Sequence, residues 1–141
     1  MKAEATGEFL RAWVDAVWNG TNDDLIDQLI SPDYVGYSVG SPEPVRGIEG
    51  FRHYNHAYKT AFPDLKLTVE DVMTSGDQAY WRFRAQGTHR GTLNGIPPTG
   101  RPVDFEGMLS SRFADGKWVE DHIQLDLLLM LQQIGAIPAA A

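Results

Sequence analysis

The chain has 141 residues, of which 19 are Asp or Glu and 12 are Lys or Arg, so its formal net charge is -7. This length suits one globular domain, predicted to span residues 1–141, and the negative charge argues against nucleic acid and membrane surfaces as partners. The sequence contains no cysteine, which excludes disulfides, thiolate nucleophiles and zinc–thiolate sites.

The first half of the chain has the spacing of helices. Residues 4–19 place apolar side chains on one face of a helix, and residues 23–30 predict a short second helix. Residues 34–39 have weak strand character, and residues 40–47, which contain two prolines, are typical of a loop. Residues 48–62 return to helical spacing and predict the third and longest helix.

The second half alternates apolar and polar residues, as strands do. Four strands are predicted, over residues 65–74, 78–88, 102–113 and 117–125, and residues 126–134 predict a closing helix. Helices followed by hairpin-linked strands are the α+β pattern, in which helices pack on one face of a mainly antiparallel sheet. We therefore expect a pocket between the two layers.

A loop rich in Gly and Pro, residues 89–101, joins the second and third of these strands. It lacks the phosphate-binding sequence of a glycine followed by lysine and then serine or threonine, and it joins strand to strand rather than strand to helix. We expect it to form a rigid rim over the mouth of the pocket.

Asp121 is the candidate acid/base residue. Alternation places it on one face of the last strand with Val119, Ile123 and Leu125, and the opposite face carries Trp118, Glu120, His122 and Gln124. Asp121 is the only carboxylate that we assign inward, and a carboxylate against apolar walls has a raised pKa that suits proton exchange near neutrality. In the alternative, the strand is flipped or bulged and Asp121 is a solvated surface acid.

His122 and Asp126 are less favoured candidates for the same role. His122 shares the polar face of the last strand and would exchange roles with Asp121 only if the strand slipped by one residue. Asp126 precedes an apolar run, which favours a role as the N-cap of the closing helix.

Large apolar side chains fall on the predicted inner faces and at the rim of the pocket. Core packing explains most of them, but aromatic rings around a concave face also suit a flat, multi-ring ligand. The substrate-binding candidates are Trp13, Tyr34, Tyr37, Phe51, Tyr58, Trp81, Phe83, Phe105, Leu109 and Ile123. Arg82 and Arg84 point outward in this assignment, toward a polar or dimer-facing surface.

Five short segments occur in an order and spacing that resemble those of the SnoaL-like polyketide cyclases, in the nuclear transport factor 2-like superfamily. They are residues 61–65 (AFPDL), 87–91 (GTHRG), 95–100 (GIPPTG), 115–117 (DGK) and 131–135 (LQQIG). The resemblance covers nearly the whole chain. It implies a cone-shaped α+β homodimer with three N-terminal helices over the concave face of the sheet, a short C-terminal helix, and no cofactor or metal. In the characterised cyclases an intramolecular aldol step closes a ring, and an aspartate transfers the protons.

The catalytic positions of those cyclases are not all kept. In an ungapped alignment from the 115–117 turn, their acid/base aspartate falls on Ile123 and one of their pocket histidines falls on Asp121. Their other polar pocket positions fall on Gly36, Gly107 and Leu109. Asp121 keeps a proton-transferring group on the same face, two residues away from the family position.

Together these features predict a cytoplasmic, cofactor-independent cyclase or isomerase. It would act by acid/base proton transfer on an apolar, multi-ring or polyketide-like substrate. A non-catalytic small-molecule-binding module on the same scaffold is one alternative. An epoxide hydrolase is another, and it would require a second carboxylate and an arginine in the pocket.

Overall fold

The computed structural model describes residues 1–138 of the chain. Its helical elements are α1 (Gly7–Trp13), the π-helix η1 (Val14–Trp18), α2 (Asp24–Leu29), α3 (Gly47–Ala61) and α4 (Leu127–Gln133). Its strands are β1 (Ile30–Ser38), β2 (Val45–Arg46), β3 (Lys66–Ser75), β4 (Gln78–Thr88), β5 (Pro102–Ala114) and β6 (Lys117–Leu125).

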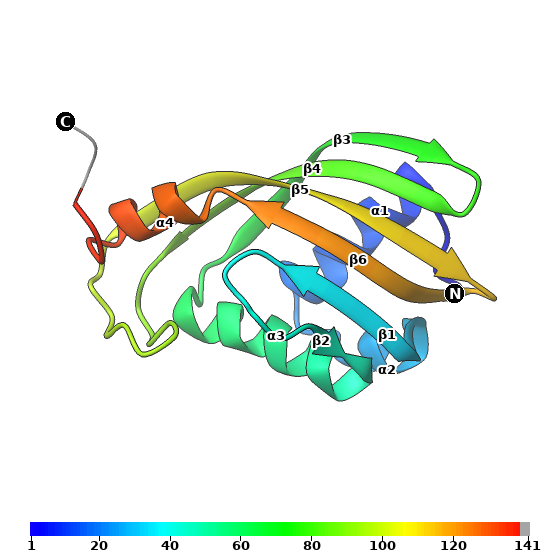
Figure 1. The fold of residues 1–141 in the computed structure, drawn as a ribbon, viewed down its shortest axis with the longest axis horizontal. Helices are drawn as coiled ribbons and strands as arrows, with labels where there is room; N and C mark the ends of the chain where they lie inside the picture. The colour runs from blue at the N-terminus through cyan, green and yellow to red at the C-terminus, as the bar shows by residue number, and fades with distance from the viewer. Residues whose placement is uncertain (139–141) are drawn as a thin grey trace.

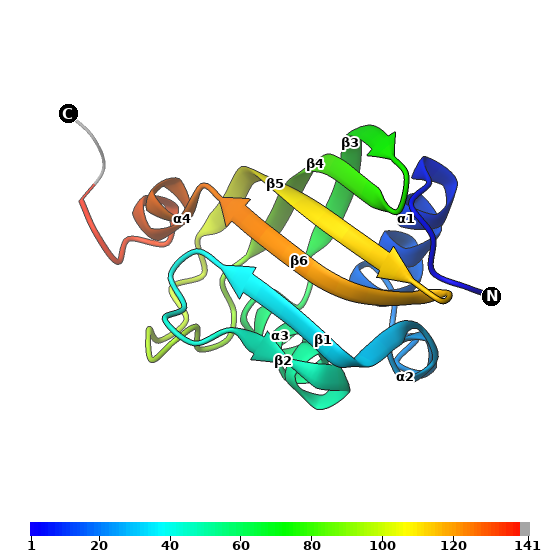
Figure 2. The same cartoon turned by 45° about the vertical axis from the view of Figure 1, so that its right-hand side comes forward.

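The six strands form one curved, unclosed sheet in the order β2-β1-β6-β5-β4-β3. All neighbouring strands pair antiparallel except β1 and β6, which run parallel. Helices α1 and α3 lie on the concave side of the sheet, and α4 follows β6 at one end of the molecule (Figures 1 and 2). The α+β prediction, with helices on one face of a mainly antiparallel sheet, is confirmed.

The first helix is not a continuous α-helix as predicted. After Trp13 the chain forms the π-helical turn η1, which is closed by a hydrogen bond of 2.9 Å from the backbone N–H of Asn19 to the carbonyl of Val14. In an ideal α-helix, residues five positions apart point in directions about 140° apart around the helix axis, and a π turn changes this angle. Trp13 and Trp18, five residues apart, both line the internal cavity.

Strand β1 begins at Ile30, where the sequence predicted the end of the second helix, and β2 lies in the segment predicted as loop. The pairing of β1 with β6 shifts in register between Ile30 and Val35. Pro32 lies within this irregular stretch, where its missing N–H does not interrupt a regular ladder. Because β1 begins at Ile30, its pairing with β6 begins there as well.

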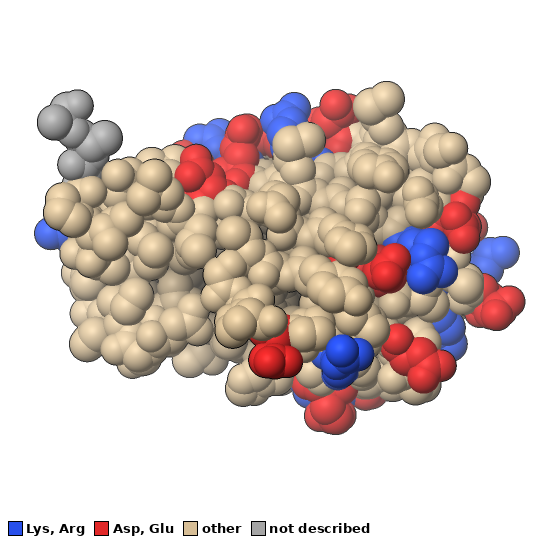
Figure 3. Space-filling model, viewed as in Figure 1, with Lys and Arg blue, Asp and Glu red and all other residues tan. Residues whose placement is uncertain are grey.

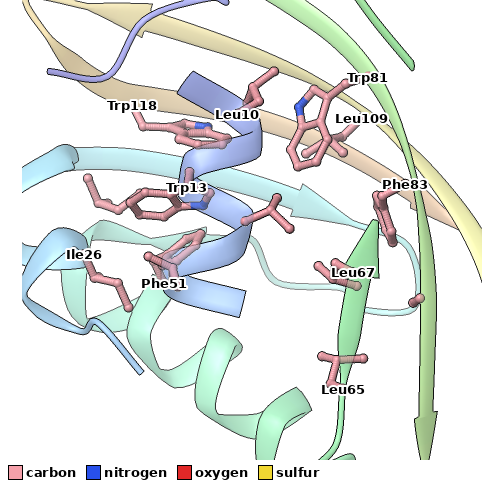
Figure 4. Packing of buried hydrophobic residues seen from close by; sticks show 14 of the residues in the cluster. Leu10, Trp13, Ile26, Phe51, Leu65, Leu67, Trp81, Phe83, Leu109 and Trp118 are labelled. Atoms are coloured by element: carbon pink, nitrogen blue, oxygen red, sulfur yellow. The ribbon is translucent and has the colours of Figure 1, made fainter. Parts of the chain in front are cut away.

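The core lies between the helices and the concave face of the sheet. The ring of Trp13 lies 5.2 Å from that of Trp118 on β6 and 5.8 Å from that of Phe51 on α3, measured between centroids. Trp81 and Phe83 of β4, with Leu67 of β3 and Leu65 just before it, face this cluster from the other side, as Figure 4 shows. No helix among residues 1–138 has the length and apolar character needed to cross a membrane.

The loop over residues 89–101 packs against the end of α3. The backbone N–H groups of Arg90 and Gly91 both donate to the carbonyl of Ala61, and His89 pairs with Gly100 and Arg101 through backbone hydrogen bonds. These bonds hold the loop, but none of its residues lines the cavity. The loop therefore forms no part of the cavity wall, and its place as a rim over the mouth stays a prediction.

Candidate active site

A cavity with a volume of about 70 Å³ lies between the helices and the sheet. Its walls are almost entirely apolar and come from α1, η1, α3 and five strand or loop segments. The lining residues are Trp13, Trp18, Phe51, Tyr54, Tyr58, Leu65, Leu67, Trp81, Phe83, Ala85, Phe105, Leu109, Trp118, Asp121, Ile123 and Leu125. A cavity of this apolar character suits an apolar ligand.

Most of the predicted substrate-binding side chains meet in this cavity. Those that line it are Trp13, Phe51, Tyr58, Trp81, Phe83, Phe105, Leu109 and Ile123. Tyr34 is buried behind the cavity wall, where its hydroxyl bonds to Asp121. Figure 4 shows Trp81 and Phe83 opposite Trp13 and Phe51, so aromatic rings face one another across the space.

Asp121 lies at the cavity wall and is only 2% exposed. Its place on β6 turns the side chain inward, and its register neighbours are Gly36 on β1 and Ser111 on β5. Neither neighbour is bulky, so the carboxylate has room. A Cβ at Gly36 would lie 2.6 Å from the hydroxyl of Tyr34, and the missing side chain at Gly36 therefore lets Tyr34 reach Asp121.

Three donors hold the carboxylate of Asp121. The hydroxyl of Tyr34 donates to Oδ2 at 2.6 Å, while the hydroxyl of Ser111 and the indole N–H of Trp118 donate to Oδ1 at 2.6 and 2.8 Å. Ser111 in turn accepts a hydrogen bond of 3.0 Å from the indole N–H of Trp81. The network fixes the position of the carboxylate and leaves Oδ2 with spare acceptor capacity.

Burial raises the pKa of Asp121 from its ordinary value to about 7. The hydrogen bonds from Ser111, Tyr34 and Trp118 oppose this rise because they stabilise the charged form, and they do not cancel it. Burial, with the carboxylate beside it, also raises the pKa of Tyr34, so the phenol keeps its proton and remains a donor. The carboxyl group of Asp121 can therefore both accept and release a proton near neutral pH.

Trp118 lies on the inner face with Asp121, and its assignment to the outer face was wrong. Arg112 of β5 pairs with Glu120, but the next residue, Phe113, pairs with Trp118, so Val119 is an extra residue in β6. Such a bulge changes the alternation of the side chains. It turns Trp118 inward, where the side chain is 2% exposed and contacts the carboxylate.

Three other predicted site residues lie away from the cavity. Tyr37 is on the outer face of β1, because Tyr34 and Gly36 point inward there, and its ring stacks on that of His122 at 4.8 Å. His122 is likewise exposed on the outer face of β6. Asp126 is the N-cap of α4, and its side chain accepts from the backbone N–H of Leu129 at 3.1 Å. Neither His122 nor Asp126 can act on a ligand in the cavity from these positions.

The sequence analysis missed several residues of the site. Those not named as site residues are Trp18, Tyr54, Leu65, Leu67, Ala85, Ser111, Trp118 and Leu125. Tyr54 had a signal, since it lies one helical turn before Tyr58 and faces the same side. Trp18 and Trp118 depend on the π turn and on the bulge, which helical or strand periodicity does not reveal.

Among the lining residues, which all belong to the described part of the chain, Asp121 is the only carboxylate and none is Lys, Arg or His. The remaining polar side-chain atoms are the hydroxyls of Tyr54 and Tyr58 and the indole nitrogens. A buried anion in this cavity would therefore find no cation, and burial of an unpaired charge is costly. The cavity suits the uncharged part of a ligand.

Known proteins share both sequence and fold with this chain. The family model described as SnoaL-like polyketide cyclase matches residues 8–134. The aklanonic acid methyl ester cyclase AcmA of Streptomyces galilaeus is 31% identical over 110 residues, which cover 77% of this chain and 75% of AcmA.

Two solved structures show the same fold. A Jannaschia sp. CCS1 protein provisionally assigned as a SnoaL-like polyketide cyclase is 28% identical, with a TM-score of 0.82 over 92% of this chain and 90% of that one. AclR of Streptomyces galilaeus, provisionally assigned as a hydroxylase, is 30% identical, with a TM-score of 0.80 over 95% of this chain and 83% of that one. The fold therefore accompanies more than one assigned reaction.

Proposed function

Because the chain belongs to the SnoaL-like polyketide cyclase family, we propose that it is a cofactor-independent cyclase or isomerase of a neutral, multi-ring polyketide-like substrate. Asp121 is the proton-transferring group in this proposal, and the aromatic walls orient the substrate. One observation carries it: a single carboxylate, with a pKa raised to about 7, lies at the wall of an otherwise apolar cavity. A general acid/base is most effective when its pKa is close to the working pH.

The proposed reaction is an intramolecular aldol step. The carboxylate of Asp121 takes a proton from a carbon beside a carbonyl group, and the C–H electron pair becomes the double bond of an enolate. The enolate carbon then attacks a second carbonyl carbon, so that a C–C bond forms and that carbonyl becomes an alkoxide. The protonated Asp121 returns its proton to the alkoxide. An isomerase would instead return the proton to another carbon, and neither route requires a further reactant.

The cavity favours a substrate whose buried part carries no charge. Within the described part of the chain no cationic side chain lines it, so a free carboxylate or a phosphate group would have to stay outside. The related AcmA is named for a methyl ester, in which the carboxylate charge is masked. We therefore propose an esterified or otherwise neutral polyketide as substrate.

Incubation with aklanonic acid methyl ester in D2O tests this proposal. The enzyme is expected to catalyse exchange of the hydrogen beside the carbonyl for deuterium, and to give a ring-closed product that is an isomer of the substrate apart from the deuterium taken up. Mass spectrometry measures the exchange, and chromatography separates the isomer. Exchange and cyclisation no faster than in buffer would contradict the proposal for this class of substrate.

A non-catalytic binding module is the second candidate, and one observation favours it. Both oxygens of the Asp121 carboxylate already accept hydrogen bonds from the protein, as in a purely structural network. Tight binding of the ester without any deuterium exchange would support this candidate. An epoxide hydrolase has less support, because the lining residues include neither a second carboxylate nor an arginine.

We further propose that two copies of the chain associate through the outer face of the sheet. One row of the register across that face holds Met73, Tyr80, Ser110, His122 and Tyr37 on successive strands. Tyr80 and Met73 are more than half exposed. Uncharged side chains cover the middle of this face, and charged ones gather toward its margins (Figure 3). Apolar area of this kind is typical of a binding surface.

Tyr80→Glu is expected to convert the dimer into a monomer, because it places like charges opposite each other at a two-fold interface. Light scattering after gel filtration measures the mass. The control is Leu128→Glu on α4, which alters an equally exposed apolar residue outside this face. A wild-type chain that is monomeric at all concentrations would contradict the proposal.

The predicted cytoplasmic location also stays a prediction, which cell fractionation would test.

A further inference from the structure

We propose that Tyr54 is a second catalytic residue, whose hydroxyl donates a hydrogen bond to the substrate carbonyl oxygen while Asp121 removes the proton from the adjacent carbon. The inference rests on the proposed function, since it assigns a donor for the enolate oxygen formed there. Proton removal beside a carbonyl moves negative charge onto that oxygen. In an apolar cavity whose described lining residues include no cation, a fixed donor at this point lowers the barrier.

Tyr54 reaches the cavity from the wall opposite the sheet. It lies on α3, and its ring packs against those of Trp18 at 6.1 Å and Tyr58 at 5.1 Å. Two aromatic contacts hold the ring in place, so the direction of the hydroxyl is constrained. Tyr54 and Asp121 line the same cavity from different layers of the fold.

The register of the sheet locates the Tyr54 hydroxyl relative to Asp121. Its oxygen lies 3.4 Å from Oγ of Ser38 on β1, and Ser38 pairs with Ile123 on β6. Ile123 is the next inward-facing residue after Asp121, and two residues along a strand span about 6.8 Å. The phenol oxygen is therefore displaced from the carboxylate by roughly the length of two residues along β6. A substrate fragment H–C–C=O fits between a base and a donor at such a spacing.

The Tyr54 hydroxyl keeps its proton. Burial, the neighbouring Tyr58 and the charge of Asp121 raise the pKa of Tyr54, so the group stays a neutral phenol throughout the pH range of proton exchange at Asp121. Its contact with Ser38 is long, and Ser38 is itself able to donate in it. With Ser38 as donor, the phenolic proton is directed toward the neighbouring hydroxyl of Tyr58 or, in its place, toward a ligand oxygen.

The other polar groups of the cavity are less suited to this role. The indole N–H groups of Trp81 and Trp118 are already engaged, with Ser111 and Asp121 respectively. Tyr58 lies one helical turn beyond Tyr54, and among residues 1–138 its hydroxyl makes no hydrogen bond with β1 or β6. Tyr58 is therefore the matched control for Tyr54, since it has the same chemistry, helix and cavity.

Ionisation of bound 2-naphthol tests the proposal without requiring turnover. Its phenolate mimics an enolate oxygen, and its absorbance shows whether the bound molecule is ionised. The titration uses the Asp121→Asn protein, in which no carboxylate in the cavity competes. Adding Tyr54→Phe is expected to raise the pKa of bound naphthol by about one to two units, the effect of removing a hydrogen bond to a charged group. Adding Tyr58→Phe, which keeps the ring in the cavity and removes a hydroxyl that is not the proposed donor, is expected to raise it by much less.

Turnover of aklanonic acid methyl ester provides the second measurement. With Asp121 intact, Tyr54→Phe is expected to lower kcat about 10²–10³-fold with little change in KM, as removal of an oxyanion donor does.

If Asp121→Asn leaves deuterium exchange intact, the proposed function fails and the naphthol titration still decides on Tyr54. If Asp121→Asn abolishes exchange but Tyr54→Phe changes neither kcat nor naphthol ionisation, the Tyr54 proposal alone is overturned. Equal effects of Tyr54→Phe and Tyr58→Phe, or no binding of naphthol, also overturn it.

Discussion

Asp121→Asn is expected to lower the rate of deuterium exchange and of ring closure by about 10²–10⁴-fold, the usual contribution of a positioned acid/base group. Asparagine has the shape of aspartate but cannot take up the proton. Its oxygen can still accept from Ser111 and Trp118, and its amide can donate to the hydroxyl of Tyr34. The substitution therefore removes the proton transfer while it keeps the hydrogen-bond network that holds β1, β5 and β6 together.

The matched control is Asp126→Asn, which removes a carboxylate outside the cavity. Asparagine is as good an N-cap as aspartate, so α4 should be preserved and activity unchanged. For the wild type, kcat/KM is expected to rise with pH and level off above about pH 7, because the carboxylate form of Asp121 is the base. Exchange by the Asp121→Asn protein at more than a tenth of the wild-type rate would rule out Asp121 as the proton-transferring group.

The same carboxylate should make the protein less stable as the pH rises from about 4 to about 7. In the folded state Asp121 keeps its proton up to about pH 7, whereas in the unfolded chain it loses the proton near its ordinary pKa of 3.8. Between these values unfolding releases a proton, so a higher pH favours the unfolded state. Each pH unit corresponds to about 1.4 kcal/mol, and a shift of about three units costs roughly 4 kcal/mol at neutral pH.

Urea unfolding of the wild type and of Asp121→Asn at pH values from 4 to 8 measures this effect. The free energy of unfolding of the variant, relative to the wild type, is expected to increase by roughly 4 kcal/mol over this range and then stay constant. Asp64 and Asp104 have lowered pKa values and act in the opposite direction, but they are present in both proteins and cancel. Parallel stability curves would mean that Asp121 does not hold its proton in the folded state.

Local patterns in the sequence were sufficient for most of the fold. The helical spacing of residues 48–62 and the alternation of the last four strands predicted α3, β3, β4, β5 and β6 to within one or two residues. These patterns are strong because each long element buries one face, so its periodicity is a direct consequence of burial. The short edge strand β2 was missed, since two residues carry no periodicity.

The inward direction of Asp121 could also be predicted from the sequence. The contacts that surround its carboxylate could not. Alternation with Ile123 and Leu125 indicated its face. The contact with Trp118, however, depends on the bulge at Val119, and a bulge arises from pairing with β5 rather than from the sequence of β6 alone.

The sequence by itself determined the order of the elements, the α+β class and the face of the last strand on which the acid lies, because all three follow from interactions between residues close in the chain. The tertiary structure alone decided which groups surround that acid. Tyr34 reaches it from 87 positions away across a glycine, and Tyr54 faces the same cavity from a helix on the other wall. Such contacts depend on the register between strands and on the packing of layers, which no local periodicity contains.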